Sequence, residues 1–158
     1  MRLAASTTAD LLQEAGGPQF EVRCLMPITN FRELQVWQQA MDLVVNVYKL
    51  TDDFPREERF TLRAQTRRTA ISIPSNIAEG ASRRTTPVFL NHIDIALGSE
   101  AELFTQLELS KRLGYASPAR VERSLQRLSV VGRMLNGLAT ALQQRLADER
   151  TSATGRDH

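Results

Sequence analysis

Arginine supplies nearly all the positive charge of this 158-residue chain, because Lys49 and Lys111 are its only lysines. One run of arginines follows the three- and four-residue steps that place side chains on one side of a helix. A guanidinium can form paired hydrogen bonds with phosphate, so such a stripe could hold a nucleic-acid backbone without reading its sequence. The predicted nucleic-acid-binding residues are Arg56, Arg59, Arg63 and Arg67, extended by Arg83 and Arg84.

Two plainer explanations compete with nucleic-acid binding. A charged stripe on a helix is usually a solvated face, and a GC-rich genome would favour arginine over lysine throughout a protein. The net charge of +2 is small. Nucleic-acid binding is therefore one hypothesis, and a purely structural interaction module is the alternative.

A second group of polar residues is spaced so that its members share a face on each of two consecutive helices. We expect it to form a polar network that sets helix register or holds a subunit interface, with Arg68 paired to Glu102. Gly98 and Ser99 are small and would allow a close helix approach. Catalysis by Asn76 and Glu79 is a weaker alternative. The network residues are Arg68, Ser72, Asn76, Glu79, Ser99 and Glu102.

Pro74 lies inside the same helical pattern. It lacks the N–H that would bond the carbonyl of Ala70, which costs roughly 3 kcal/mol in a helix interior. We expect a kink that Ser72, Ser75 and Asn76 repair by donating to the freed carbonyl. Exposure of Asn76 to a ligand at the kink is the alternative.

Four amphipathic segments must position these residues. The first runs from an Asn30 and Glu33 capping box to about residue 50, and the second from about Pro55 to a left-handed stop at Gly80. The third opens at Thr86 and Pro87 and ends before Gly114, and the fourth opens at Ser117 and Pro118. In the first segment, the predicted apolar stripe is Leu34, Trp37, Met41, Val44, Val47 and Tyr48.

Helices of this length joined by short turns can bury their apolar stripes only against one another. The sequence thus predicts an all-α, antiparallel up-down-up-down four-helix bundle over residues 29–148. Residues 1–28 read as an irregular arm and residues 149–158 as a disordered tail. One hypothesis is that the arm is an artefact of gene prediction, with Met26 as the true start.

Few features point to an enzyme. Cys24 is the single cysteine, and the two histidines, His92 and His158, are far apart in sequence. No Glu-x-x-His pair, glycine-rich phosphate loop or serine nucleophile motif is present. We therefore expect a noncatalytic protein with no metal and no cofactor. No signal peptide or apolar membrane span is evident, so we expect a cytoplasmic location without membrane contact.

Several segments occur in the order and spacing of a known family. The matching segments are Phe31-Arg32-Glu33-Leu34 with Val36, Trp37 and Ala40; Phe54-Pro55; Gln65, Arg67 and Arg68; Ser72-Ile73-Pro74-Ser75-Asn76-Ile77-Ala78-Glu79-Gly80; and Ala96, Gly98, Ser99, Glu102 and Leu103. The chain resembles the four-helix bundle proteins encoded in intervening sequences of bacterial 23S ribosomal RNA genes. Its long N-terminal arm, Phe60 and Thr69 depart from the family pattern.

The resemblance implies a homopentamer of bundles around a central channel. One branch of the family, the accessory variability protein of diversity-generating retroelements, binds nucleic acid and a reverse transcriptase. From the resemblance we therefore expect a homo-oligomer, with RNA or DNA and a reverse transcriptase as candidate partners. Most members have no established function.

Overall fold

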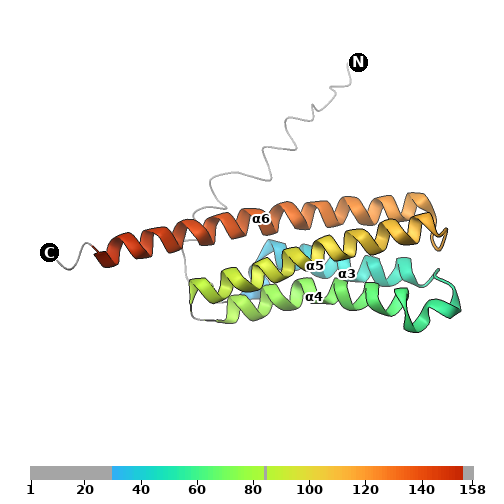
Figure 1. Ribbon diagram of the computed structural model, residues 1–158, viewed down its shortest axis with the longest axis horizontal. Coiled ribbons are helices and arrows are strands. Elements are labelled where there is room, and N and C mark those ends of the chain that lie inside the picture. Colours follow the sequence, from blue (N-terminus) through green and yellow to red (C-terminus); the bar gives the residue numbers. More distant parts are fainter. Residues whose placement is uncertain (1–29, 84, 155–158) are drawn as a thin grey trace, which may run out of the picture.

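The computed structural model describes residues 30–83 and 85–154, and these contain four antiparallel α-helices and no strand (Figure 1). Helices α3 and α5 each pack against both α4 and α6, whereas helices at opposite corners make no contact. This arrangement confirms the predicted up-down-up-down bundle. The predicted arm, the alternative start and Arg84 lie outside the described residues. The α-helices are α3 (Gln35–Thr51), α4 (Leu62–Ser82), α5 (Thr86–Arg112) and α6 (Pro118–Thr154).

One apolar core runs along the axis of the bundle and receives side chains from all four helices. Each large aliphatic side chain removed from water contributes about 1.5–3 kcal/mol, which is what holds the helices together. None of the described helices has the length and apolar character needed to cross a bilayer. The largest fully buried side chains are Leu43, Leu50, Ile73, Ile77, Ile93, Leu103, Leu107, Leu128, Leu135, Leu138, Val47 and Val121.

The predicted apolar stripe of α3 is displaced around the helix. The core positions are Val36, Ala40, Leu43, Val47 and Leu50, which also follow three- and four-residue steps. Most of the predicted stripe lies on the flank beside the core face, so its larger members stay partly or largely exposed. Two overlapping apolar stripes exist in this segment, and packing against α6 as well as α4 selects the one that points between them.

The predicted helix starts fall on short 3-10 helices. Asn30 caps η1 (Phe31–Glu33), where its Oδ1 accepts from the Arg32 backbone N–H at 3.1 Å. Helix α3 begins only after the extended Leu34. The bond predicted from Glu33 to the Asn30 backbone is replaced by a 3.5 Å contact between the two side chains.

Helix α4 begins at Leu62 rather than near Pro55. Pro55 instead precedes η2 (Arg56–Phe60), and Thr61 has a non-helical backbone that separates the two helices. Glu58 caps α4, because its Oε2 accepts from the Leu62 N–H at 3.0 Å and from the Thr61 hydroxyl. A carboxylate at this end also interacts favourably with the helix dipole.

Gly80 is not a left-handed stop. It lies buried inside α4, and among the described residues only Gly114 has positive φ, at 70°. A Cβ on Gly80 would lie 2.7 Å from the Cβ of His92 and 2.7 Å from Cδ2 of Phe89. Glycine is required at this position because α5 approaches α4 too closely for any side chain.

Helix α6 is longer than predicted and continues to Thr154. It extends beyond the ends of the other helices (Figure 1). The Thr86 hydroxyl, at the start of α5, donates to Glu149 Oε1 at 3.0 Å. The frayed tail was thus predicted to begin too early, because a contact with another helix supports residues that look uniformly polar. Residues 155–158 lie outside the described part of the chain.

Two polar contacts join the α3–α4 and α5–α6 connections, which lie at the same end of the bundle (Figure 1). Arg120 pairs with Asp53, and its Nη2 also donates to the carbonyl of Lys49 at 2.8 Å. The hydroxyl of Tyr115 donates to Glu58 Oε1 at 2.9 Å. Both contacts fix the second helical hairpin against the first.

The hydrogen bonds to Glu58 also shift the pKa of its carboxyl group. The Thr61 hydroxyl and then the Leu62 backbone N–H lower the pKa of the Glu58 carboxyl below its ordinary value of 4.5. The Tyr115 hydroxyl adds a third hydrogen bond, and this contact raises the pKa of Tyr115 above 10.0. Ionised Glu58 is therefore favoured by the folded state.

We predict opposite effects for alanine at two glycines of adjacent helices. Gly80→Ala should destabilise the fold by about 1–3 kcal/mol, because the added methyl group overpacks the contact with α5. Gly98→Ala should stabilise it by about 0.5–1 kcal/mol, because nothing in the chain lies within 4 Å of the added Cβ and alanine is the better helix former. Urea unfolding of both variants measures the difference, and equal effects would contradict the proposed close contact at Gly80.

We predict that Glu58 contributes to acid sensitivity. Because its pKa is lowered on folding, its stabilisation is complete above about pH 4.5 and is lost as the pH falls through the lowered value. Glu58→Gln should lose less stability than the wild type between about pH 6 and about pH 3 in urea titrations. Glu57→Gln, which removes the adjacent exposed carboxylate, serves as the control for the change in charge. The assignment fails if Glu58→Gln and Glu57→Gln show the same acid loss.

Candidate functional surfaces

The α4–α5 contact contains a line of hydrogen-bonded polar side chains. At its centre, Glu102 Oε1 accepts three hydrogen bonds. Gln65 and Thr69 donate from α4 at 3.1 Å each, and Gln106 donates from α5 at 2.9 Å. Gln106 is 7 % exposed, and its side-chain amide also donates to the Thr69 hydroxyl at 3.1 Å. We call these four residues the Glu102 node.

A second chain of hydrogen bonds continues along the same contact. Ser99 Oγ donates to the carbonyl of Ile95 at 3.1 Å, so Ser72 must supply the hydrogen of the 2.8 Å Ser72–Ser99 contact. Asn76 Nδ2 donates to Ser72 Oγ at 3.2 Å. Asn76 Oδ1 is then the acceptor for His92 Nδ1 at 3.1 Å, so Nδ1 carries a proton.

Glu79 lies at the end of this chain and is exposed. Its Oε1 is 2.9 Å from Arg83 Nη2 and 3.9 Å from His92 Nε2. The hydrogen bond from Arg83, followed by the charge of His92, lowers the pKa of Glu79. Four of the six predicted network residues, namely Ser72, Asn76, Ser99 and Glu102, are therefore joined across α4 and α5, with Glu79 at their margin.

The predicted pairing of Arg68 with Glu102 is wrong. Arg68 is exposed and makes no ion pair within the described residues. Thr69 occupies the position opposite Glu102, and a neighbouring residue on a helix is rotated by about 100°. The donors that sequence reasoning missed are Gln65, Thr69, Gln106 and His92. For Gln65, Thr69 and Gln106, the signal was the four-residue spacing within each of the pairs 65/69 and 102/106.

Pro74 is accommodated without the predicted repair. Helix α4 is continuous through it, and Pro74 is buried. Asn76 Nδ2 donates to the carbonyl of Ser72 at 2.9 Å rather than to that of Ala70, and the Ser72 hydroxyl is used by Ser99. The hydroxyl and amide groups near the proline therefore connect the two helices instead of satisfying the carbonyl that the proline leaves free.

Arg63 and Arg67 do not form a free stripe. Both donate to Asp52 Oδ1, at 2.7 Å and 2.8 Å, and their side chains are only 24 % and 22 % exposed. Arg67 also donates to the Thr51 hydroxyl at 2.7 Å and to the Tyr48 carbonyl at 3.2 Å. Because it bonds a terminal carbonyl, Arg67 caps the C-terminal end of α3.

The remaining predicted arginines are divided between two places. Arg83, the residue that follows α4, pairs with Glu79 four positions earlier in the sequence. Arg56 and Arg59 lie on η2 and are exposed, without a carboxylate partner among the residues that the structure describes. The single stripe is thus contradicted, because the 3-10 helix and the break at Thr61 interrupt the helical spacing.

Two arginines outside the predicted set lie at the same end of the bundle as η2. Arg112 ends α5, and Arg123 lies in the second turn of α6. Both are exposed, and neither has an ion pair within residues 30–83 and 85–154. Glu57, between the two η2 arginines in sequence, is an exposed carboxylate that partly offsets this charge. We call Arg56, Arg59, Arg112 and Arg123 the turn-end arginines.

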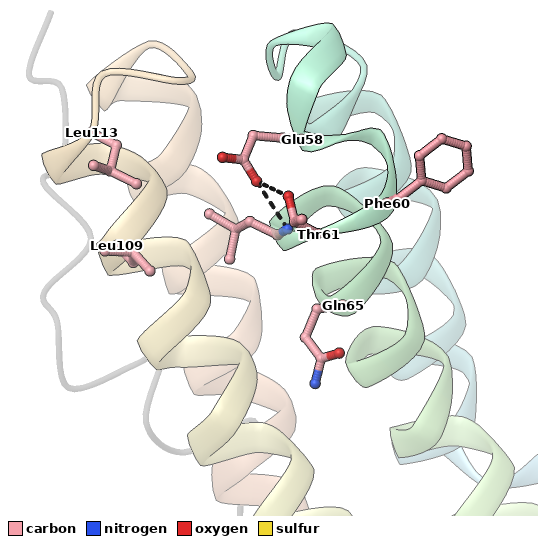
Figure 2. A pocket seen from close by; sticks show the side chains of 7 residues that line it. Glu58, Phe60, Thr61, Gln65, Leu109 and Leu113 are labelled. Atoms are coloured by element: carbon pink, nitrogen blue, oxygen red, sulfur yellow. Dashed lines mark hydrogen bonds between the residues drawn. The ribbon is translucent and has the colours of Figure 1, made fainter.

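An open cleft lies at this end of the bundle (Figure 2). One side is formed by η2 and the start of α4, and the other side by the end of α5. Leu109 of α5 and Leu113, the residue after that helix, line one side of it, while Glu58, Thr61 and Gln65 line the other side. Phe60 projects away from the α5 side of the cleft and is 83 % exposed. The cleft adjoins the Glu102 node, since Gln65 belongs to both.

Within the described ranges, no three residues of the types His, Cys, Asp and Glu gather where they could hold a metal ion. The Asn76 side chain is hydrogen-bonded to Ser72 and His92. What the arrangement can do is fix helix register and present charge at defined positions.

We predict that the Thr69 hydroxyl stabilises the α4–α5 contact. Thr69→Val should cost about 1 kcal/mol, because Glu102 loses a donor and buried Gln106 loses an acceptor. Thr66→Val is the matched control, since the buried Thr66 hydroxyl bonds only the Leu62 carbonyl of its own helix and its loss should cost less than the loss of the Thr69 hydroxyl. Urea unfolding compares the two, and equal costs would contradict a special role for Thr69.

Comparison with known proteins agrees with the architecture. The family model of the 23S rRNA-intervening sequence protein matches residues 32–137. A similar solved structure is a protein of unknown function from the S23 ribosomal protein family of Bacteroides thetaiotaomicron VPI-5482, with a TM-score of 0.62 and 24 % identity. The match covers 66 % of this chain and 95 % of that one, and no curated protein sequence matches. The chain belongs to the 23S rRNA-intervening sequence protein family.

Proposed function

We propose that this protein is a noncatalytic, cytoplasmic four-helix bundle that assembles into a homo-oligomer and binds nucleic acid through arginines. The proposal modifies the sequence-based hypothesis in one respect. It assigns binding to the turn-end arginines rather than to a continuous stripe, because Arg63 and Arg67 are engaged with Asp52.

The observation that carries the proposal is the set of turn-end arginines. These side chains are exposed and form no ion pair in the part of the chain that the structure describes. They come from η2, α5 and α6, which brings positive charge from distant sequence positions to one end of the bundle. A guanidinium without a carboxylate partner can contact phosphate without first breaking an internal salt bridge.

Assembly into an oligomer would place several copies of the turn-end arginines in one particle. A pentamer, the state implied by the family resemblance, would present five such ends, and neutralising several phosphates at once raises affinity and makes it depend steeply on salt. RNA and DNA share the phosphate chemistry that the proposal uses. A reverse transcriptase is a further candidate partner, as the resemblance to the retroelement branch suggests.

A purely structural interaction module is the second candidate. It is supported by exposed apolar side chains on the outer flanks of α3 and α4, including Met41, Val45 and Ile71. Such residues are typical of protein contacts when they are contiguous. This candidate predicts no affinity for nucleic acid at physiological salt.

We predict that Arg56→Ala combined with Arg59→Ala weakens binding to a fluorescent single-stranded RNA and to a DNA duplex. Fluorescence anisotropy at several salt concentrations measures it. The slope of log affinity against log salt should fall by about 1 for each arginine that contacts phosphate. Affinity at fixed low salt should fall by about 10-fold or more, because lost phosphate contacts act on all sequences alike.

Arg133→Ala combined with Arg145→Ala is the charge-matched control. Arg133 bonds Ser129 and Arg145 bonds Glu149, both within α6. This control should keep most of the affinity and the salt slope. Equal losses for the two double variants would show that only net charge matters, and no binding by the wild type would favour the structural module.

A further inference from the structure

Phe60 is the most exposed large apolar side chain that the structure describes. It is 83 % exposed, whereas Val45, the next in order, is 52 % exposed. The ring projects away from the α5 side of the cleft and pairs with no other aromatic ring among the described residues (Figure 2). A side chain stabilises a fold by leaving water, so the bundle itself gives no reason for a phenylalanine at this position.

The backbone that carries Phe60 is held by hydrogen bonds on both sides. Within η2, the Glu58 backbone N–H donates to the Pro55 carbonyl at 3.0 Å, and the Thr61 N–H donates to the Glu58 carbonyl at 3.2 Å. The Glu58 side chain then bonds the Leu62 N–H at the start of α4. Because this turn is already ordered, stacking of a flat molecule on Phe60 would require little further ordering of the chain.

Two of the turn-end arginines lie beside this ring. The guanidinium carbon of Arg59 lies over the Phe60 ring at 5.2 Å from its centroid, within the range of a cation–π contact. This contact uses none of the N–H donors of Arg59 in a hydrogen bond, so they can still bond phosphate oxygens. Arg56 lies three residues earlier on η2, and residues at this spacing share one side of a 3-10 helix. An aromatic surface and two cations are therefore adjacent on one short turn.

We propose that η2 binds a single-stranded stretch of nucleic acid, with an unpaired base stacked on Phe60 and neighbouring phosphates bound by Arg56 and Arg59. Charge complementarity and the flat ring identify this occupant, because each nucleotide joins an aromatic base to an anion. Inside a duplex both faces of a base are covered by its neighbours, so Phe60 could reach a base face only at an end. The inference rests on the nucleic-acid binding of the proposed function and names the class of nucleic acid.

Single strands of RNA and DNA offer the same base faces and phosphates to this surface, so the test uses both. A protein surface is the competing occupant, since aromatic side chains and arginine are enriched in protein interfaces. A protein contact gives no reason why loss of the Phe60 ring should weaken binding to single strands and leave binding to a duplex unchanged. A contact with a second copy of this chain would change the mass of the protein in solution.

The test is the affinity of Phe60→Ala for fluorescent oligouridylate, oligothymidylate and a DNA duplex of the same length, measured by anisotropy. Phe60→Ala should lose about ten-fold in affinity for both single strands, which is the effect of removing one base–aromatic stack. Its salt dependence should stay unchanged, because the ring contacts no phosphate. Its affinity for the duplex should also stay at the wild-type value.

Phe104→Ala is the matched control, because Phe104 is another exposed phenylalanine, at 50 %, on α5. It should keep the wild-type affinity. Phe60→Leu retains apolar bulk without a flat aromatic face and should lose nearly as much affinity as Phe60→Ala, whereas Phe60→Trp should keep it. Bound oligonucleotide should quench the fluorescence of Phe60→Trp more than that of the wild type, whose only tryptophan, Trp37, lies toward the end of α3 that is opposite η2.

Unchanged affinity of Phe60→Ala for the single strands would overturn the inference, and so would an equal loss for the duplex. A lower mass of Phe60→Ala by light scattering would also overturn it, because Phe60 would then lie in a contact between copies. Its urea midpoint should match that of the wild type, since the side chain is exposed. If Arg56→Ala with Arg59→Ala weakens binding and Phe60→Ala does not, the proposed function stands and only the stacking fails. A wild type that binds none of the three probes removes both.

Discussion

The register between α4 and α5 is the constraint on which the other features of this protein depend. Apolar burial alone would tolerate small shifts between two helices, because neighbouring aliphatic side chains are nearly equivalent. Hydrogen bonds at three levels, centred on Glu102, Ser99 and His92, are satisfied together in only one alignment. At Gly80, α5 approaches α4 too closely for a side chain, which also restricts how the two helices can shift. A shift of one turn would leave several half-buried polar groups unpaired, each at a cost of about 1–3 kcal/mol.

The arginines of this chain serve two physical roles. Arg67 and Arg120 donate to carbonyls near the C-terminal end of α3, where the helix dipole favours positive charge. Each comes from a different helix, so the same contacts join α3 to α4 and to α6. The turn-end arginines have no carboxylate partner within the described residues. Their charge is therefore available to other molecules.

Helix content, helix order and the turn signals could be predicted from the chain. Pro87, Gly114 and Pro118 lie where the sequence indicates, because proline and glycine constrain the backbone locally. Four long amphipathic segments with short connections leave little alternative to an antiparallel bundle. The core stripe of α3 could not be predicted in the same way, since two overlapping apolar stripes fit the same helical period and only contact with two neighbouring helices distinguishes them.

The membership of the candidate site was predictable only in part, and its pairing was not predictable. Spacing placed Ser72, Asn76, Ser99 and Glu102 on facing sides of two helices, and this could be read from the chain because the helical period is fixed. Whether Arg68 or Thr69 meets Glu102 depends on a rotation of about 100°, and only the packed pair of helices sets it. Which arginines are bonded within the chain and which stay exposed is likewise decided by the tertiary structure. An arginine is free or hydrogen-bonded according to which carboxylates and carbonyls the fold brings near it. The spacing of residues in the sequence does not determine those distances.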